Sequence, residues 1–171
     1  MKLILFEYLC KTCGLIFKAP QINPHAYGEF LLRKKNSPAL RYLDATSSAA
    51  YSEVAEDLWT NSKTNSFDEV TQSDILQSIF GAVACDPDGD GQPFEIGLLP
   101  YCSACNEDSN LSWKITEPIK FVEIDVPPVE FIEWRKLTAQ EKKLRIDLHL
   151  TKIFKSGNPR ITGNSSGQLK I

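Results

Sequence analysis

The chain has 171 residues, of which 42% are hydrophobic, and a formal net charge of −3. A chain of this size buries roughly 70% of its unfolded surface, which favours one domain. The strands and helices predicted below make this a single α+β domain over residues 1–155. The composition excludes collagen-like and coiled-coil proteins, and no segment approaches the roughly 20 apolar residues that span a bilayer.

The first third of the chain shows the patterns of short strands. The run 2–9 enters a Cys-x-x-Cys pair and the run 15–17 leaves it. The runs 29–35 and 40–45 flank Asn36-Ser37-Pro38-Ala39, whose turn-forming residues predict a hairpin.

Helical periodicity begins near residue 49. Residues 49–59 place Val54 and Leu58 on one face, with Ser47 or Ser48 as the expected N-cap. Residues 73–84 carry a second apolar stripe at helical spacing, and such a stripe is typical of a protein core.

The remaining chain returns to strands before a final helix. Runs 111–116 and 120–126 are predicted strands, and 129–137 is predicted as a further extended run. The capping box Thr138-Ala139-Gln140-Glu141 predicts a helix that reaches about residue 149. Residues 156–171, rich in Gly, Ser and Asn, are predicted to be a flexible tail.

Two cysteine pairs with identical spacing are the strongest functional signal. They are Cys10 with Cys13 and Cys102 with Cys105, and each pair is followed directly by Gly14 or Asn106, the residue types that best tolerate a left-handed conformation. Four thiolates in a tetrahedron form a closed structural zinc site. The sequence therefore predicts one zinc ion on all four cysteines, although 88 residues separate the pairs where about 15–20 are usual.

Two other interpretations of the cysteines remain open. A thioredoxin-like motif needs a helix that starts at its first cysteine, and Gly14 with the strand-like run 15–17 argues against one. Iron in a rubredoxin-like site has the same donor set as zinc.

The first pair also resembles a known family. The segment Phe6–Lys18 reads FEYLCKTCGLIFK, which is similar to the knuckle that opens bacterial zinc-ribbon proteins of the putative-regulator, formamidase-regulator type. The resemblance covers only residues 6–18, and the second pair of that family follows after a much shorter gap. It implies a metal site at all four cysteines. The two knuckles and their flanking strands then predict a zinc-ribbon lobe, about 1–20 with 97–126, that carries a hairpin-plus-helices insertion at about 21–96.

Other candidate sites are weaker. Residues 86–91 match the first half of a calcium loop, but position twelve is Gly97 in place of glutamate, so a solvated turn is the preferred interpretation. His25 has no acidic residue nearby in the sequence, His149 is interpreted as a helix-face residue, and Cys85 is predicted to be a buried, inert thiol. No catalytic residues or small-molecule substrate are predicted, because no nucleophile or phosphate-loop signature is present.

Charge is unevenly distributed along the chain. Residues 44–110 carry one base and thirteen acids, whereas the segments on either side are net positive. The simpler interpretation of this acidic middle is a solvated surface that keeps the protein soluble. The functional interpretation is a surface for a basic protein partner, with Glu53, Glu56, Asp57, Asp68 and Glu69 as its candidate residues.

The expected function is a non-enzymatic, zinc-stabilised protein-binding module in the cytoplasm, for example an immunity or antitoxin-like protein. The cytoplasmic expectation rests on the metal-type cysteine spacing and on an apolar N-terminal run that is too short for a signal peptide. One alternative is a nucleic-acid-associated regulator that uses the basic clusters 33–35 and 142–145. A thiol-redox enzyme is the third class.

Overall fold

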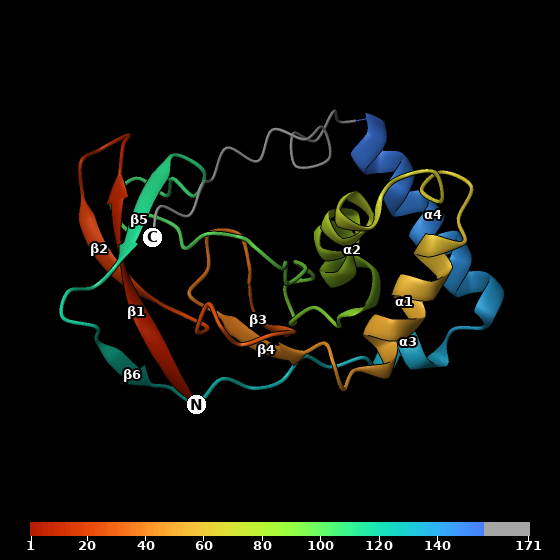
Figure 1. Ribbon diagram of the computed structural model, residues 1–171, viewed down its shortest axis with the longest axis horizontal. Helices are drawn as coiled ribbons and strands as arrows, with labels where there is room; N and C mark the ends of the chain where they lie inside the picture. Colours follow the sequence, from red (N-terminus) through yellow and green to blue (C-terminus); the bar gives the residue numbers. More distant parts are fainter. Residues whose placement is uncertain (156–171) are drawn as a thin grey trace. The chain divides into compact units, whose positions relative to one another are not determined.

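The computed structural model describes residues 1–155, which form six strands and four helices (Figure 1). The strands make two antiparallel sheets, so the predicted α+β class is confirmed. The predicted tail 156–171 lies outside the described residues. No helix in the described part of the chain has the length and apolar character needed to cross a membrane.

The described chain divides into two compact units. Of the described residues, the first contains 1–47 and 87–129, and the second contains 48–86 and 130–155. The sequence-based division grouped residues 21–96 as one insertion. The contacts instead group the hairpin at 29–44 with the cysteine-bearing strands, and only the helices form the other unit.

The first unit is built around a long central strand. Strand β1 (Lys2–Cys10) pairs with β2 (Ile16–Gln21) on one side, and with β5 (Leu111–Ile115) and β6 (Phe121–Glu123) on the other. All three pairings are antiparallel. Strand β1 therefore joins the N-terminal hairpin to segments more than a hundred residues later.

One face of this sheet carries a small aromatic core. Phe6, Tyr8 and Ala19 are buried there, and Tyr8 stacks on Phe17 at 5.4 Å between ring centroids. Leu99, from the segment that leads to the second cysteine pair, packs against the same cluster. The apolar core thus extends to the cysteine end of the sheet.

The predicted hairpin is confirmed as a second, two-stranded sheet. Strands β3 (Glu29–Arg33) and β4 (Leu40–Asp44) pair in register, and Leu32 and Leu43 are buried. Backbone hydrogen bonds between Arg33 and Glu95 attach the hairpin to the later segment of the same unit.

The second unit is helical and contains α1 (Ala49–Trp59), α2 (Glu69–Ala84), α3 (Ile132–Lys136) and α4 (Ala139–Lys155). Its core consists of the fully buried apolar side chains of these helices: Val54, Leu58, Ile75, Ile79, Phe80, Val83, Trp134, Ile146 and Leu150. Each such side chain contributes about 1.5–3 kcal/mol of transfer free energy. The unit therefore has a core of its own.

Side-chain caps set the starts of three helices. Ser48 accepts from the Tyr51 N–H at 3.2 Å, which confirms the predicted start of α1. The capping box of α4 is also confirmed, because Thr138 and Glu141 bond reciprocally. Helix α2 starts four residues before the predicted position, since Asp68 caps it through the Thr71 N–H at 2.8 Å.

Two predictions in the C-terminal part were wrong. The run 129–137 is not extended throughout, because residues 132–136 form α3. The carboxylate of Asp86 accepts from the N–H groups of Ile132 and Glu133 at 2.5 and 3.0 Å and so caps this helix from a distant part of the chain. Helix α4 continues to Lys155 rather than ending near residue 149, because Leu150 remains on its buried face.

A polar cluster holds α1 to the C-terminal helices. Glu53 Oε2 accepts from the buried Trp134 Nε1 at 2.9 Å and from Lys142 Nζ at 2.6 Å, while Lys142 lies over the Trp134 ring. The Lys142 ammonium and the Trp134 N–H together hold the pKa of Glu53 below its ordinary value of 4.5, against the opposing effect of burial.

This cluster predicts a pH dependence of stability. A carboxyl group whose pKa falls on folding stabilises the protein above its unfolded pKa and loses that effect as the pH drops through the folded value. We expect Glu53→Gln to lower the free energy of unfolding near neutral pH, with a difference from the wild type that shrinks below pH 4.5. Urea unfolding at several pH values measures this. A difference that does not depend on pH would contradict the assignment.

Candidate metal centre

The four predicted ligands converge at one end of the first sheet. Cys10 ends β1, Cys13 lies in the turn that follows, and Cys102 and Cys105 lie in the loop before β5. Their four Sγ atoms all lie within 4.8 Å of one another. Among the described residues, these four thiols form the one group of this kind that could hold a metal ion.

The thiol spacing fits a tetrahedral ion. Cys10 Sγ is 3.6 Å from Cys105 Sγ, and Cys13 Sγ is 3.5 Å from Cys102 Sγ. Four sulfurs at the usual zinc–sulfur distance of about 2.3 Å lie about 3.8 Å apart. A disulfide would need about 2.05 Å, and all four cysteines are free. The thiols are therefore arranged as a set of metal ligands.

The two loops share one backbone conformation. In the first, the Gly14 N–H donates to the Cys10 carbonyl at 2.8 Å, and the Cys10 N–H donates to the Leu15 carbonyl. The second repeats both bonds, with Asn106 donating to the Cys102 carbonyl at 2.8 Å. Gly14 and Asn106 have φ angles of 77° and 59°, so the left-handed conformation that the sequence predicted at both positions is confirmed.

This conformation aims backbone N–H groups at the sulfurs. The Leu15 N–H donates to Cys13 and the Glu107 N–H donates to Cys105, while Cys102 receives two such bonds. Burial opposes ionisation of Cys102, yet the N–H groups of Ala104 and Cys105 lower its pKa to about 7.

The remaining thiols resist ionisation beside a first thiolate. The Glu107 N–H favours the Cys105 thiolate, but burial and the neighbouring sulfurs raise its pKa to about 12. Four thiols in so small a space cannot all ionise without a cation to offset their mutual repulsion. A divalent metal supplies that charge and deprotonates coordinating thiols.

A hydrogen-bond network outside the thiols joins the two loops. Thr12 donates to Glu107 Oε2 at 3.2 Å, and Glu107 Oε1 accepts from the hydroxyl and N–H of Ser109 at 2.6 and 2.8 Å. These Ser109 bonds and the Asn110 N–H lower the pKa of Glu107 to about 2. Glu107 is a supporting residue that the sequence analysis missed. Its position two residues after Cys105, before Asp-Ser-Asn, was the available signal.

Neither cysteine pair has the thioredoxin arrangement. Residues 11–13 and 103–105 form turns, and β2 rather than a helix follows the first pair. A thioredoxin-like cysteine gains its reactivity from the N-terminus of a helix, which neither pair has.

The five predicted partner-binding acids have different roles. Glu53 binds Trp134 and Lys142, Asp57 lies 3.8 Å from Lys143, and Asp68 caps α2. Glu56 and Glu69 are exposed, and no hydrogen bond or ion pair within residues 1–155 engages their carboxylates. The acidic surface that remains for a partner is therefore smaller than predicted.

The loop that partly matched a calcium site binds side-chain cations instead. Lys34 Nζ lies 2.6 Å from both oxygens of Asp90 and 3.3 Å from Asp88, and Arg41 bonds the other Asp88 oxygen at 2.6 Å. Asp86 caps α3. The three carboxylates that would start a calcium loop thus have protein partners, in line with the preferred interpretation as a turn.

Several residues of the two basic clusters are buried or paired with acids within the described structure. Arg33 and Lys34 are only 6% and 4% exposed, and an Arg33 guanidinium N–H donates to the Pro20 carbonyl. Burial lowers the pKa of Arg33. Only Lys35 of the first cluster is exposed to solvent. In the second, Lys142 and Lys143 each face an acid of α1.

The isolated histidines and Cys85 show no site. His25 lies in a turn, and His149 bonds the Arg145 carbonyl of its own helix at 3.0 Å. Burial raises the pKa of the Cys85 thiol to about 12, which fits the predicted inert cysteine.

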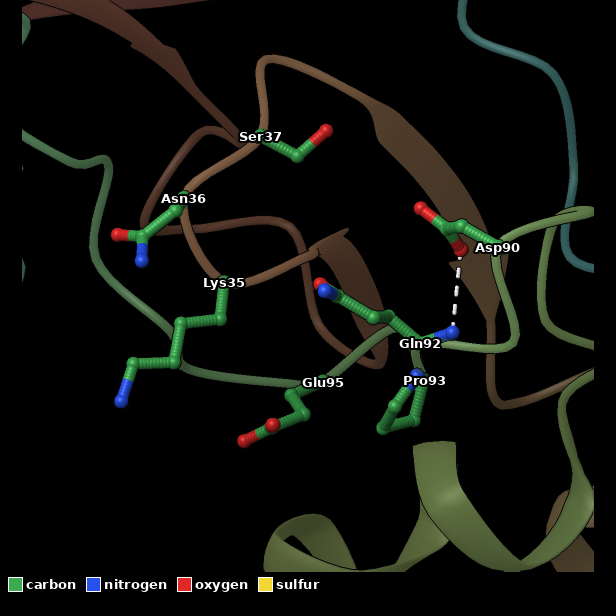
Figure 2. Close-up of a pocket in the computed structure, with 7 residues that line it drawn as sticks. All are labelled: Lys35, Asn36, Ser37, Asp90, Gln92, Pro93 and Glu95. Atoms are coloured by element: carbon green, nitrogen blue, oxygen red, sulfur yellow. Dashed lines mark hydrogen bonds between the residues drawn. The ribbon is translucent and has the colours of Figure 1, made fainter.

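A hollow of about 480 Å³ lies between the β3–β4 turn and the segment before the second cysteine pair, and Figure 2 shows the side chains that line it. Its lining is mainly polar: Lys35, Asn36, Ser37, Asp90, Gln92, Pro93 and Glu95. Asp90 already accepts from Lys34 and from the Gln92 N–H, so its carboxylate belongs to the wall. Small-molecule sites are usually lined mostly by apolar residues, whereas Pro93 is the one apolar residue in this lining.

Comparisons of the chain with protein-family models, with curated proteins and with solved structures found no match. The interpretation of the cysteine site therefore rests on its own geometry.

The two left-handed positions give a matched test of the loop geometry. An added Cβ at Gly14 meets no atom within 4 Å, so Gly14→Ala should cost only the conformational penalty of about 1–2 kcal/mol. Asn106→Ala should also destabilise the protein, whereas Asn106→Gly should not. Denaturant unfolding of the metal-loaded protein measures all three. Equal stability of Asn106→Ala and Asn106→Gly would argue against the shared conformation.

Proposed function

We propose that this chain is a non-enzymatic protein-binding module whose first unit is held together by one zinc ion on Cys10, Cys13, Cys102 and Cys105. The observation that carries the proposal is the convergence of four thiols within 4.8 Å from two loops of equal conformation. Four protein thiolates fill a tetrahedral site and leave no position for water or substrate, which favours a structural role.

The arrangement of the strands supports a zinc ribbon. The β1–β2 hairpin carries the first cysteine loop, and the second loop leads into β5, which pairs with β1. The resemblance of residues 6–18 to regulator-type zinc-ribbon proteins agrees with the first half of this arrangement. The long segment between the two loops is the departure from that family.

The expected partner is a basic protein, in the manner of an immunity or antitoxin-like protein of the cytoplasm. Glu56 and Glu69 support this, because they are exposed and no ion pair within residues 1–155 engages them. A nucleic-acid role receives less support, since Arg33 and Lys34 are buried and bonded. Free, metal-spaced cysteines agree with a reducing compartment.

Metal content tests the structural part of the proposal. We expect about one zinc per chain, and its loss together with a large fall in thermal stability in Cys10→Ser and Cys102→Ser, because metal binding is coupled to folding. Elemental analysis and thermal unfolding measure the two effects. Cys85→Ala is the matched control, since this thiol lies outside the cluster, and it should retain the zinc. A metal-free protein with reversibly oxidised thiols would instead favour the redox enzyme.

Charge reversal tests the partner surface. The double variant Glu56→Lys, Glu69→Lys changes two exposed acids that no side-chain bond within residues 1–155 engages, so the expected fall in stability is about 1 kcal/mol, mainly from losing the Glu69 charge in the first turn of α2. We expect it to weaken binding to a basic partner protein, measured by calorimetry. Unchanged binding would show that these acids only form a solvated surface. A parallel change at Glu53 would be uninformative, because Glu53 binds Trp134 and Lys142.

A further inference from the structure

Of the three strands that flank β1 in the first sheet, β2 and β5 differ in their free edges. Strand β2 has its outer edge interrupted by Pro20, which has no N–H, and the Pro20 carbonyl accepts from Arg33. Proline and engaged backbone groups are common protections against pairing with another chain. The outer edge of β2 therefore cannot pair with a further strand at Pro20.

No proline and no bond from the described part of the chain protects the outer edge of strand β5 in this way. The bonds Lys11 N–H to Asn110 carbonyl and Thr116 N–H to Leu5 carbonyl set its register against β1, so Ser112 and Lys114 also face β1. The N–H and carbonyl groups of the alternate residues, Leu111, Trp113 and Ile115, then point away from β1. Within residues 1–155 no other strand pairs with them.

The side chains along this edge give it a chemical character. Trp113 is 43% exposed and lies 5.3 Å from Phe6, between ring centroids, on the face that carries the aromatic core. On the other face the Lys114 side chain is 73% exposed, with Glu7 of β1 3.4 Å from its ammonium. An added strand would thus meet an indole on one face and an ammonium group on the other.

The cysteine cluster lies next to the start of this strand. The second cysteine loop leads into β5, and the Asn110 carbonyl accepts from Lys11 in the first loop at 3.0 Å. An ion on the four thiols would fix both loops, and with them the position of β5 beside β1. A fixed edge loses little conformational entropy on binding, which favours association.

We propose that the open edge of β5 binds an extended segment of a protein partner as an additional antiparallel strand, with apolar side chains beside Trp113 and acidic side chains beside Lys114. This inference rests on the proposed protein-binding function and locates a second contact surface for it. Backbone hydrogen bonds would supply affinity, and the side chains on the two faces of the edge would supply specificity, as in other cases of strand addition. Glu7 pairs with the Lys114 ammonium, but the Lys114 side chain is 73% exposed, so it can also contact an acidic side chain of the added strand.

Amide hydrogen exchange on the zinc-loaded full chain tests whether the edge is open. We expect the amides of Leu111, Trp113 and Ile115 to exchange at least about tenfold faster than those of Ser112 and Lys114. Protection of the outward amides in the free protein would overturn the proposal. A dependence of that protection on protein concentration would identify a second copy of the chain as the occupant instead.

A strand-forming peptide then tests occupancy. The probe is a synthetic peptide of about nine residues that alternates glutamate with valine, a strand pattern. We expect it to protect the three outward amides, and N-methylation of alternate peptide residues should weaken binding by about tenfold, because it removes edge hydrogen bonds. Equal binding of the methylated peptide, or no binding of either, would overturn strand addition.

Charge exchange tests the acidic preference. Lys114→Glu should weaken binding of the glutamate peptide by about fivefold and strengthen binding of a peptide with lysine in place of glutamate. Lys18→Glu is the matched control, because Lys18 faces Glu7 from β2, on the opposite side of β1, and should leave binding unchanged. If both variants weaken binding equally, the preference for glutamate comes from the net charge of the protein rather than from Lys114. That result would overturn the binding of the peptide at the β5 edge. Zinc content, measured on each variant, keeps failure of this inference distinct from failure of the metal centre.

Discussion

The convergence of two cysteine pairs that are 88 residues apart in the sequence is the constraint on which the first unit depends. It brings the end of the β1–β2 hairpin against the loop that leads into β5, and only a few hydrogen bonds through Thr12, Glu107 and Asn110 join the same loops. The thiols themselves oppose full ionisation, since their proximity raises the pKa of Cys105 to about 12. A cation on the four thiols would reverse that opposition and would couple metal binding to assembly of the sheet.

The parts of the fold that follow from neighbouring residues were predictable. The helix at 49–59, the hairpin at 29–44 and the capping box at Thr138 depend on local periodicity, turn residues and caps. The cysteine set was predictable for a different reason, because two identical spacings with left-handed positions behind them point to one ion even across a long gap.

The rest depended on contacts that no local pattern indicates. Helix α3 is short and draws its cap from Asp86, 46 residues earlier, so residues 129–137 gave no sign of it. Lys34 and Asp90 lie 56 residues apart in the sequence and bond at 2.6 Å. This bond engages a lysine of the basic cluster 33–35 and a carboxylate of the possible calcium loop at 86–91. Counting charges along a sequence overestimates the charge free for partners, because burial and pairing use part of it.

X-ray absorption at the zinc edge on the purified full chain tests the central claim most directly. The account predicts four sulfur neighbours at about 2.3 Å and no nitrogen or oxygen ligand, with the signal lost in Cys102→Ser. A bound zinc with fewer than four sulfurs, or one whose spectrum is unchanged in Cys102→Ser, would contradict a shared site and with it the metal's role in joining β5 to the N-terminal hairpin.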